Sequence, residues 1–446
     1  MTHSAADTLI ETELGRIPSS WRIRRFDEVL DSDLGKMLSR ASKTGRGSRP
    51  YLRNANVQWG RVETTDVYEM DFPEEQRERF RLRSGDLLIC EGGEVGRTAI
   101  WRGEIEECYY QKAIHRARPR DGRIDSEFFM YHMMHAFLVR KVYGIQGTTT
   151  TIAHLPAVKL KALPIPVPPL SEQRAIAHVL RTVQRAREAT VKVIAAARQV
   201  KQSLMCHLFT FGSVAVDQAD RVVLRETAFG SVPSRWSTSL LSQCADVQTG
   251  ITKGRSIDRG DSIEVPYLRV ANVQDGFLDL AEMKQIAIKR TEISRFSLQD
   301  GDVVLTEGGD FDKLGRGFVW RSEVPGCVHQ NHIFAVRTHR DALAPDFLAY
   351  LTQSPYGKKY FLSVAHRTTH LACINSTKLK ALPVPLPTEE EQRAIVGILR
   401  CIDHKLQVEE RRLVSQALLF DSLLHNLMTG KVRVHDLNLA EVGVIA

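Results

Sequence analysis

The sequence predicts an α+β protein in which two repeated mixed α/β domains are separated by a pair of long antiparallel coiled-coil helices, with pseudo-two-fold symmetry. Three observations lead to this fold class: the 446 residues contain an internal repeat, each copy leaves its globular part through alternating prolines, and each proline segment enters a heptad-patterned helix. A chain of this length is expected to form two or three domains of ~100 to 200 residues each.

The internal repeat has a period of about 217 residues, because matching segments lie 215 to 219 positions apart. Pro50–Gly60 and Pro266–Gly276 are identical at nine of eleven positions, and Lys159–Ile176 matches Lys378–Ile395. Solenoid units are much shorter, at ~20 to 50 residues. The repeat is therefore a duplicated module rather than a solenoid.

Each copy begins with a globular part of mixed secondary structure. Short β-rich runs such as Asp86–Cys90 and Asp302–Leu305 are separated by Gly, Asn and Asp residues. Helices are predicted at Ser126–Tyr143 and Pro345–Leu362.

Proline then forces an extended segment in each copy, at Pro164–Pro168 and Pro383–Pro387, because it fixes φ and disfavours helix in the preceding residue. Beyond it, apolar residues repeat in alternating steps of three and four, the a/d seam of a coiled coil. The predicted seam of the first helix is Ile176, Val179, Val183, Ala186, Thr190, Val193, Ala197, Val200, Leu204 and Leu208. The predicted seam of the second is Ile395, Ile398, Ile402, Leu406, Glu409, Leu413, Ala417, Phe420, Leu424 and Leu427.

The linker between the copies favours antiparallel pairing of these helices. Two helices of ~38 to 41 residues are ~57 to 60 Å long. Parallel pairing would require the linker to bring the second domain back beside the first. A linker of ~14 residues spans at most ~48 Å, less than the length of the helix, which makes this hard. The predicted division of the chain is a first domain at 1–165, a proline-led spacer and helix at 166–212, a linker at 213–225, a second domain at 226–384, and a second proline-led spacer, helix and C-terminal tail at 385–446.

Composition limits the compartment and the type of partner. The net charge is +8, and Phe128–Lys201 alone holds eleven Lys or Arg against two Asp or Glu, a local excess of 9. This regional positive charge favours a polyanionic partner. No apolar stretch reaches the ~20 residues of a membrane span, and Met1–Glu13 lacks a secretory pattern. We therefore expect a cytoplasmic protein without a membrane partner.

No motif predicts catalysis by this chain. Seven cysteines occur without a Cys-x-x-Cys pair, which argues against a Cys-based zinc site or a disulfide framework. A P-loop, a His-Glu-x-x-His motif and the Asn/Asp-Pro-Pro-Tyr/Phe motif of an amino-methyltransferase are all absent from the sequence. Glu282–Lys284 and Asp403–Lys405 match half of a nuclease motif, but neither recurs in the other copy. We predict no catalytic and no metal-ligating residues.

The repeated motifs resemble a known family. Each copy carries Pro-Tyr-Leu-Arg with Ala-Asn-Val-Gln, then Gly-Asp with Glu-Gly-Gly, then Gln111 or Gln330 before a strand, then Leu-Pro-Ile/Val-Pro with Glu-Gln-Arg-Ala-Ile. The last motif of the pattern is Leu427–Val434, at the end of the second predicted helix. This order, doubled over essentially the whole chain, is similar to that of the specificity (S) subunit of type I restriction-modification systems, the HsdS family.

The resemblance implies that the globular parts are target-recognition domains, each reading one half of a bipartite sequence in double-stranded DNA. It implies that two methylation (M) subunits dock on the helices and that restriction (R) subunits join the full complex. S-adenosylmethionine, ATP and Mg are then expected on those partner subunits, and no cofactor is expected on this chain.

Candidate DNA-binding residues are chosen by their chemistry, because arginine and lysine hold phosphates and read guanine. Five lie in a Gly/Ser-rich loop of the first copy, and three lie in the equivalent loop of the second. Two further arginines of the first copy have matching arginines in the second, and these two pairs suit shared phosphate contacts. The loop candidates are Lys36, Arg40, Lys43, Arg46, Arg49, Lys253, Arg255 and Arg259, and the shared candidates are Arg53, Arg97, Arg269 and Arg316.

Apolar residues beside the predicted seams are candidates for partner binding, since a two-helix pair leaves apolar flanks for other helices to cover. They are Leu180, Ile194, Leu399 and Leu419.

Two other function classes stay open at this point. The chain could be a coiled-coil scaffold that binds only proteins, with its charge keeping it soluble. It could also be an enzyme that acts alone, which the missing motifs disfavour.

Overall fold

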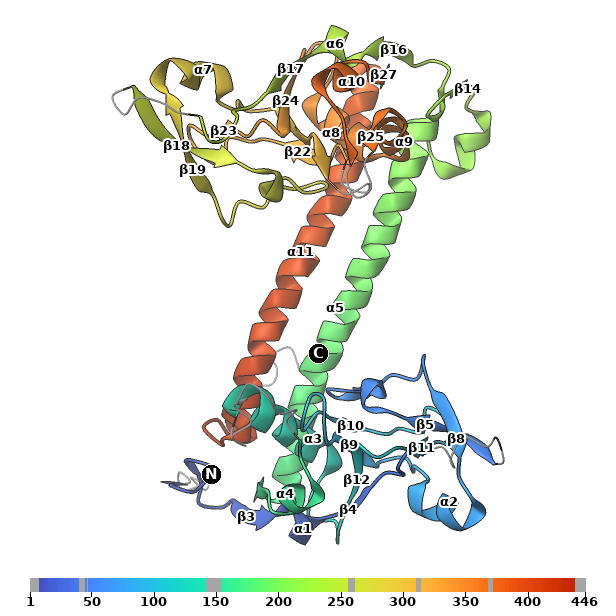
Figure 1. Ribbon diagram of the computed structural model, residues 1–446, viewed down its shortest axis with the longest axis vertical. Helices are drawn as coiled ribbons and strands as arrows, with labels where there is room; N and C mark the ends of the chain where they lie inside the picture. Colours follow the sequence, from blue (N-terminus) through green and yellow to red (C-terminus); the bar gives the residue numbers. More distant parts are fainter. Residues whose placement is uncertain are drawn as a thin grey trace. The chain divides into compact units, whose positions relative to one another are not determined.

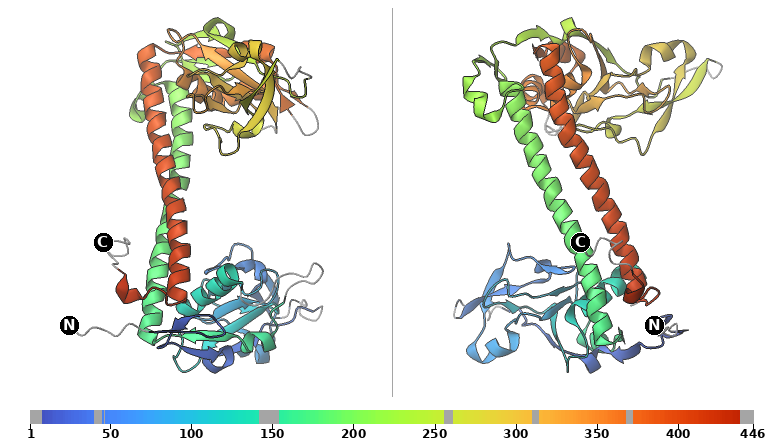
Figure 2. Two further views of the ribbon diagram at one scale, coloured as in Figure 1. Left: turned by 90° about the vertical axis from the view of Figure 1, so that its left-hand side faces the viewer. Right: turned by 180° about the vertical axis from the view of Figure 1, so that it is seen from behind.

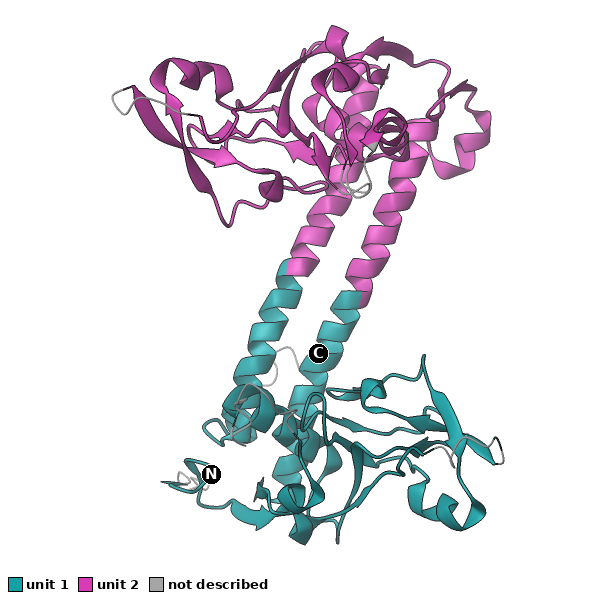
Figure 3. Ribbon diagram, viewed as in Figure 1, with its two compact units in different colours: residues 1–191, 411–446 teal, residues 192–410 magenta. Residues whose placement is uncertain are grey.

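The computed structural model describes residues 8–39, 45, 47–141, 154–255, 261–309, 314–367 and 372–437. The chain divides into two compact units (Figure 3). Unit 1 contains Met1–Val191 and Arg411–Ala446, and unit 2 contains Lys192–Glu410. Two long helices, α5 (Leu170–Phe211) and α11 (Glu389–Met428), contribute one half to each unit.

Unit 1 is built on a four-stranded antiparallel sheet (Figure 1). Its strand order is β10 (Thr98–Ile100), β9 (Leu87–Cys90), β12 (Ile114–Pro119) and β4 (Leu30–Leu34). A second sheet has the order β11 (Tyr109–Tyr110), β5 (Ser48–Leu52) and β8 (Tyr68–Asp71). Three strand pairs complete the unit, namely β1 (Leu9–Ile10) with β2 (Ile17–Pro18), β3 (Arg22–Arg25) with β13 (Pro164–Val167), and β6 (Val57–Gln58) with β7 (Arg61–Val62). The short helices are α1 (Phe26–Val29), α2 (Glu74–Phe80), α3 (Ser126–Met134) and α4 (Ala157–Lys161), with single turns η2 (Asn54–Asn56), η3 (His135–Arg140) and η8 (Val434–Asp436).

Unit 2 repeats the strand order of both of these sheets. Its four-stranded sheet has the order β22 (Gly317–Val319), β20 (Val303–Thr306), β24 (Ile333–Thr338) and β17 (Ala245–Thr249), and its second sheet has the order β23 (Val328–His329), β18 (Ser262–Leu268) and β19 (Lys284–Lys289). The remaining strands are β14 (Leu224–Thr227) with β15 (Gly230–Pro233), β16 (Ser237–Leu240) with β27 (Pro383–Leu386), and β21 (Gly308–Gly309), β26 (Ala372–Cys373) and β25 (His366–Arg367). The helices are α6 (Leu241–Cys244), α7 (Ile293–Phe296), α8 (Pro345–Gln353), α9 (Pro355–Val364) and α10 (Ser376–Lys380), with turns η4 (Val216–Arg221), η5 (Val270–Asn272) and η6 (Arg290–Glu292). The predicted repeat of mixed α/β domains is confirmed.

The proline segments are extended in both units, as predicted, and each forms an edge strand. Among the described residues, β13 pairs with β3 alone, and β27 pairs with β16 alone. An edge strand tolerates proline because one side of it needs no backbone N–H donor.

Within each unit the two long helices run antiparallel, as predicted. The core of unit 1 joins Val183, from the first half of α5, to Phe420 and Leu427 near the end of α11. The core of unit 2 joins Leu208, near the end of α5, to Ile395 at the start of α11. In each unit these helix surfaces share one core with the globular part, which covers one side of the pair (Figure 2).

The predicted seam is wrong at three positions. Val193, Val200 and Ile398 are 41%, 49% and 39% exposed, while their neighbours Ile194 and Leu399 are buried. The seam of α5 therefore steps from Thr190 to 194, 197 and 201, and position 201 is a lysine. Apolar spacing alone did not indicate this seam, because a lysine occupies one of its positions. Lys201 Nζ lies 2.6 Å from the Asp403 carboxylate of α11, so an ion pair replaces an apolar contact there.

The helices predicted in the globular parts are each divided. α3 ends at Met134 and continues as the π-helical turn η3, and a break at Ser354 separates α8 from α9. At this break the Ser354 hydroxyl caps α9 by accepting from the Gly357 N–H. The two helices approach each other closely here, because a Cβ on Gly357 would overlap the Leu351 carbonyl. Among the helices described, none is long and apolar enough to cross a membrane.

Candidate DNA interface and partner surface

Each unit pins the start of its basic loop to the turn that precedes a central strand. Lys36 forms a parallel bridge with Gln111, and Ile251 forms the same bridge with Gln330. Gly35 and Gly250 precede these bridges, and a Cβ on either would overlap a carbonyl of the facing turn. Glycine is therefore needed at both positions, and the two loops begin at the same place in the fold.

Lys36 points into unit 1 rather than away from it. Its Nζ donates to the Asp71 carbonyl at 2.6 Å and lies 5.0 Å from the centre of the Phe72 ring. Burial lowers the pKa of this amine below its ordinary value. The equivalent residue in unit 2 is the buried Ile251, so this position supports the loop in both units.

The remaining loop candidates differ in whether their charged groups pair with a carboxylate of the chain. Arg49 bonds Glu107 at 3.2 Å, and Arg255 forms two hydrogen bonds with Glu292, at 3.0 and 2.6 Å. Lys253 is exposed, and it is the one loop candidate in the described chain whose side chain has no partner. Four candidates lie outside the described residues, namely Arg40, Lys43, Arg46 and Arg259.

Arg53 and Arg269 brace the loops they belong to. Arg53 donates to the carbonyl and the carboxylate of Asp66, at 3.0 and 2.6 Å, and stacks 3.5 Å over the Tyr68 ring. Arg269 donates to the Glu282 carbonyl at 2.7 Å. Both guanidinium groups are engaged within the chain, and a DNA contact by either stays a prediction.

Arg97 and Arg316 tie the glycine-rich segment to the neighbouring turn. Arg97 donates to the Asn54 carbonyl at 2.7 Å and pairs with Glu94 at 3.1 Å. Arg316 donates to the Gln274 side chain. The Nε atoms of both arginines are buried, so part of each guanidinium is closed to solvent.

The expected apolar flanks of the helix pair lie elsewhere than predicted. Leu180 and Leu399 belong to the cores of their own units, and Ile194 is buried as well. The premise that these three are exposed is therefore wrong, because all three side chains are buried within their own units. Leu419 is 37% exposed and remains a candidate. Exposed apolar residues that the sequence reasoning missed are Val191, Val193 and Val200 on α5, and Ile398, Val408, Val414 and Leu418 on α11.

A half-buried carboxylate joins each globular part to a long helix. In unit 1, Glu127 at the start of α3 accepts from Arg102 at 2.9 Å and from Arg181 of α5 at 2.6 Å. In unit 2 the equivalent Asp346 accepts from Arg321 at 2.6 Å and pairs with Arg400 at 2.7 Å. Burial raises the pKa of Asp346, but the two arginines outweigh it and the pKa lies below its ordinary value.

A second carboxylate, at the start of each long helix, joins that helix to the rest of its unit. Glu172 of α5 accepts from Trp21 at 3.2 Å and from Arg433 at 2.7 and 2.9 Å. Glu391 of α11 accepts from Trp236 at 2.9 Å and from Arg235 at 2.5 Å. The repeated Pro-Ser-x-Trp segment was visible in the sequence, but its carboxylate partner some 150 residues away was not.

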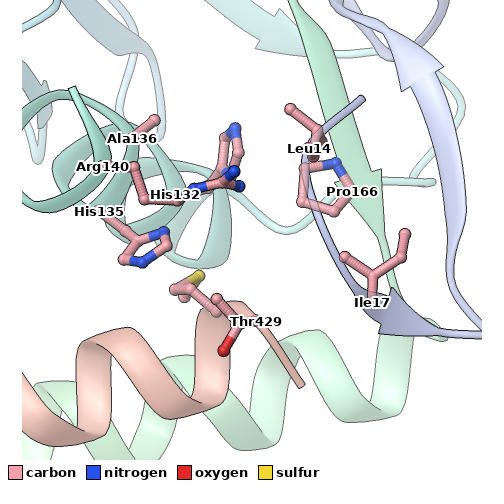
Figure 4. A pocket seen from close by; sticks show the side chains of 9 residues that line it. Leu14, Ile17, His132, His135, Ala136, Arg140, Pro166 and Thr429 are labelled. Carbon is pink, nitrogen blue, oxygen red and sulfur yellow. The ribbon is translucent and has the colours of Figure 1, made fainter. Parts of the chain in front are cut away.

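Unit 1 also holds a cluster of histidines beside a small pocket with a volume of about 10 Å³ (Figure 4). His132 and His135 line it together with Arg140, and His135 lies 3.3 Å from His425 of α11. Lys431 contacts the other nitrogen of His425 at 3.0 Å. Burial, together with the nearby positive charge of Arg140, lowers the pKa of His132 and of His135 to about 3.

Acidification is therefore expected to destabilise unit 1. Because the folded-state pKa lies below the ordinary value of ~6.5, the unfolded chain binds protons first as the pH falls. The contribution of the neutral histidines to the stability of the folded state is complete above about pH 6.5 and is lost as the pH falls toward 3. Going from about pH 7.5 to about 5.5 should cost about 1.3 kcal/mol for each of the two histidines. Urea unfolding at both pH values should show this loss in the wild type, and a His132→Gln, His135→Gln variant should lack that part of it. An equal pH dependence in both proteins would refute the assignment.

The comparisons with known proteins agree with this repeated architecture. The family model described as type I restriction modification DNA specificity domain matches residues 18–196 and again 233–415. The chain belongs to this family. DNA recognition within a type I restriction-modification system is its function, and the protein-only scaffold is not favoured.

Relatives and a solved structure match over most of the chain. The MjaVIII type I restriction enzyme specificity subunit of Methanocaldococcus jannaschii is 23% identical over 432 residues, covering 95% of each chain. The EcoKI specificity subunit of Escherichia coli K12 is 23% identical over 400 residues, covering 86% of this chain and 82% of that one. The crystal structure of the type I S subunit from M. genitalium matches with a TM-score of 0.54 at 17% identity, covering 91% of this chain and 96% of that one, which shows a shared fold.

Proposed function

We propose that this chain is the non-catalytic DNA-recognition subunit of a type I restriction-modification complex. Each globular part reads one half of a bipartite target, and the long helices dock two methylation subunits. The proposal is carried by one observation: both units have the same strand order, yet their candidate DNA loops, Gly35–Arg49 and the equivalent Gly250–Val265, differ in sequence. One scaffold with two different reading loops suits a target with two different halves.

The chemistry of modification and cleavage belongs to partner subunits under this proposal. S-adenosylmethionine would bind the two methylation subunits, while ATP and Mg would serve the restriction subunits. This chain would hold the DNA and fix where those subunits act, in the cytoplasm.

Exchanging one globular part tests the assignment of one domain to one half-site. Met1–Pro164 is replaced by the first domain of another specificity subunit, and methylated positions are mapped across the genome of cells that carry the chimera with its methylation subunit. One half-site should change completely while the other stays as in the wild type. Unchanged methylation sites would favour the scaffold, and a change in both halves would refute the assignment. Transfer of a labelled methyl group by the purified chain alone would show that it is itself an enzyme.

A further inference from the structure

A glutamine occupies the same position in both units although its neighbours differ. Gln111 lies in Tyr109–Ala113 and Gln330 lies in Val328–His332, and glutamine is the one residue that these two five-residue segments share. Each segment consists of a short strand, β11 or β23, and the turn that leads into β12 or β24 (Figure 1).

The backbone of each glutamine is fully used by the fold. The N–H of Gln111 donates to the Leu52 carbonyl at 3.1 Å, and its carbonyl accepts from the Ile114 N–H at 3.2 Å. Gln330 makes the same two bonds, with Leu268 at 3.0 Å and Ile333 at 2.9 Å. These bonds involve main-chain atoms alone, so they place no demand on the type of side chain.

The side-chain amides, by contrast, take no part in the hydrogen bonding of the described chain. Both glutamines are half-buried, and within the described chain neither amide has a hydrogen-bond partner. Gln58 and Gln274 provide a comparison, since they are also shared by the two copies. Their side chains donate to the carbonyls of their own turns, each at 2.8 Å, which explains why glutamine stands there.

The two free amides lie where the basic loops begin. Gln111 is bridged directly to Lys36, and Gln330 to Ile251, at the pinned starts of the loops that differ between the units. In unit 1 this turn also lies beside the glycine-rich segment, since the Glu91 N–H donates to the Ala113 carbonyl at 2.8 Å.

We propose that Gln111 and Gln330 each donate a side-chain hydrogen bond to the sugar-phosphate backbone of DNA, in the same way in both half-sites. The inference rests on the proposed function and adds a shared contact to it. The two domains read different sequences through different loops, whereas the DNA backbone is the same in both halves. A donor present in both domains therefore suits the backbone, and such contacts set the register of a reading domain without carrying sequence information.

The test measures DNA affinity of the chain assembled with its methylation subunit. The probes are a labelled duplex that contains the mapped methylation target and a duplex of mixed sequence. Gln111→Ala and Gln330→Ala should each weaken binding of both duplexes about fivefold, the yield of one neutral hydrogen bond. The double variant should weaken both about 25-fold, since distant sites add. The preference for the target duplex should not change. The dependence of affinity on salt should also not change, because an amide displaces no counterion.

A second pair of variants guards against misfolding. Gln111→Glu and Gln330→Glu preserve the size of the side chain but replace the donor with a carboxylate, which repels phosphate. They should weaken binding more than alanine does. Gln218→Ala serves as the control, because this exposed glutamine of the linker lies outside both sheets. Native assembly with the methylation subunit, measured by size-exclusion chromatography, should persist in all variants.

The outcomes separate this inference from the proposed function. Failure of the wild-type complex to bind DNA would overturn the proposed function itself. Wild-type binding with affinities of the double variant within twofold of it would overturn the inference alone. Loss confined to the target duplex would mean base reading, and loss of assembly would mean a partner contact; either result would contradict a shared backbone contact.

Discussion

Replacing Val200 and Leu419 by aspartate is expected to remove both methylation subunits from the complex. These two residues occupy equivalent positions of the repeat, 219 apart, one in each unit, and they are 49% and 37% exposed. Covering an apolar side chain of this size contributes about 1.5 to 3 kcal/mol, and a buried unpaired charge adds a further cost. Affinity for a docked subunit should fall by roughly 100-fold or more at each site.

The stoichiometry of the assembly makes this prediction specific. The wild-type chain should bind two methylation subunits, each single variant one, and the Val200→Asp, Leu419→Asp double variant none, as measured by native mass spectrometry. Val223→Asp is the matched control, since Val223 is exposed but lies in the linker before β14. Retention of two subunits by the double variant would place the docking surface elsewhere on the chain.

The core residue Leu399 shows why exposure decides which helix variants are informative. Leu399 is fully buried in the core of unit 2, and a charge there would unfold the unit rather than release a partner. Apolar spacing placed Leu399 on an outer flank because it assigned the neighbouring Ile398 to the seam. In the structure Ile398 is 39% exposed and Leu399 is buried, so the seam of α11 is shifted by one residue at this point. On α5 the seam includes Lys201, which apolar spacing could not indicate.

The duplicated fold was predictable from sequence because matched motifs fix it locally. Gly-Asp before a buried strand, the proline exit and the heptad steps each determine a local conformation, and each occurs twice. The roles of the arginines were not predictable in this way. Arg53 and Arg97 are held by Asp66 and by the Asn54 carbonyl, partners that only the folded chain brings close.

Lengthening the long helices is expected to move the two half-sites apart. α5 and α11 each pass from one unit into the other, and the unit boundary falls at Val191–Lys192 and Glu410–Arg411. Four residues inserted at both points add about one helical turn, or ~6 Å. DNA rises ~3.4 Å per base pair, so the spacer between the half-sites should grow by one or two base pairs.

Alanine and glutamate suit the inserted turn, because both favour helix and keep its outer face soluble. Insertion into α5 alone should abolish methylation, since the two helices would then lose register along their seam. A four-residue insertion in the linker 213–225 is the control, and it should leave the spacer unchanged.

Genome-wide mapping of methylated positions in cells carrying the doubly lengthened chain tests the central claim most directly, namely that the helices set the distance between two independent DNA readers. The account predicts the same two half-site sequences, separated by one or two additional base pairs, because no residue has moved within its own domain. Methylation at the original spacing would contradict the role of the helices, and altered half-sites would contradict the independence of the readers.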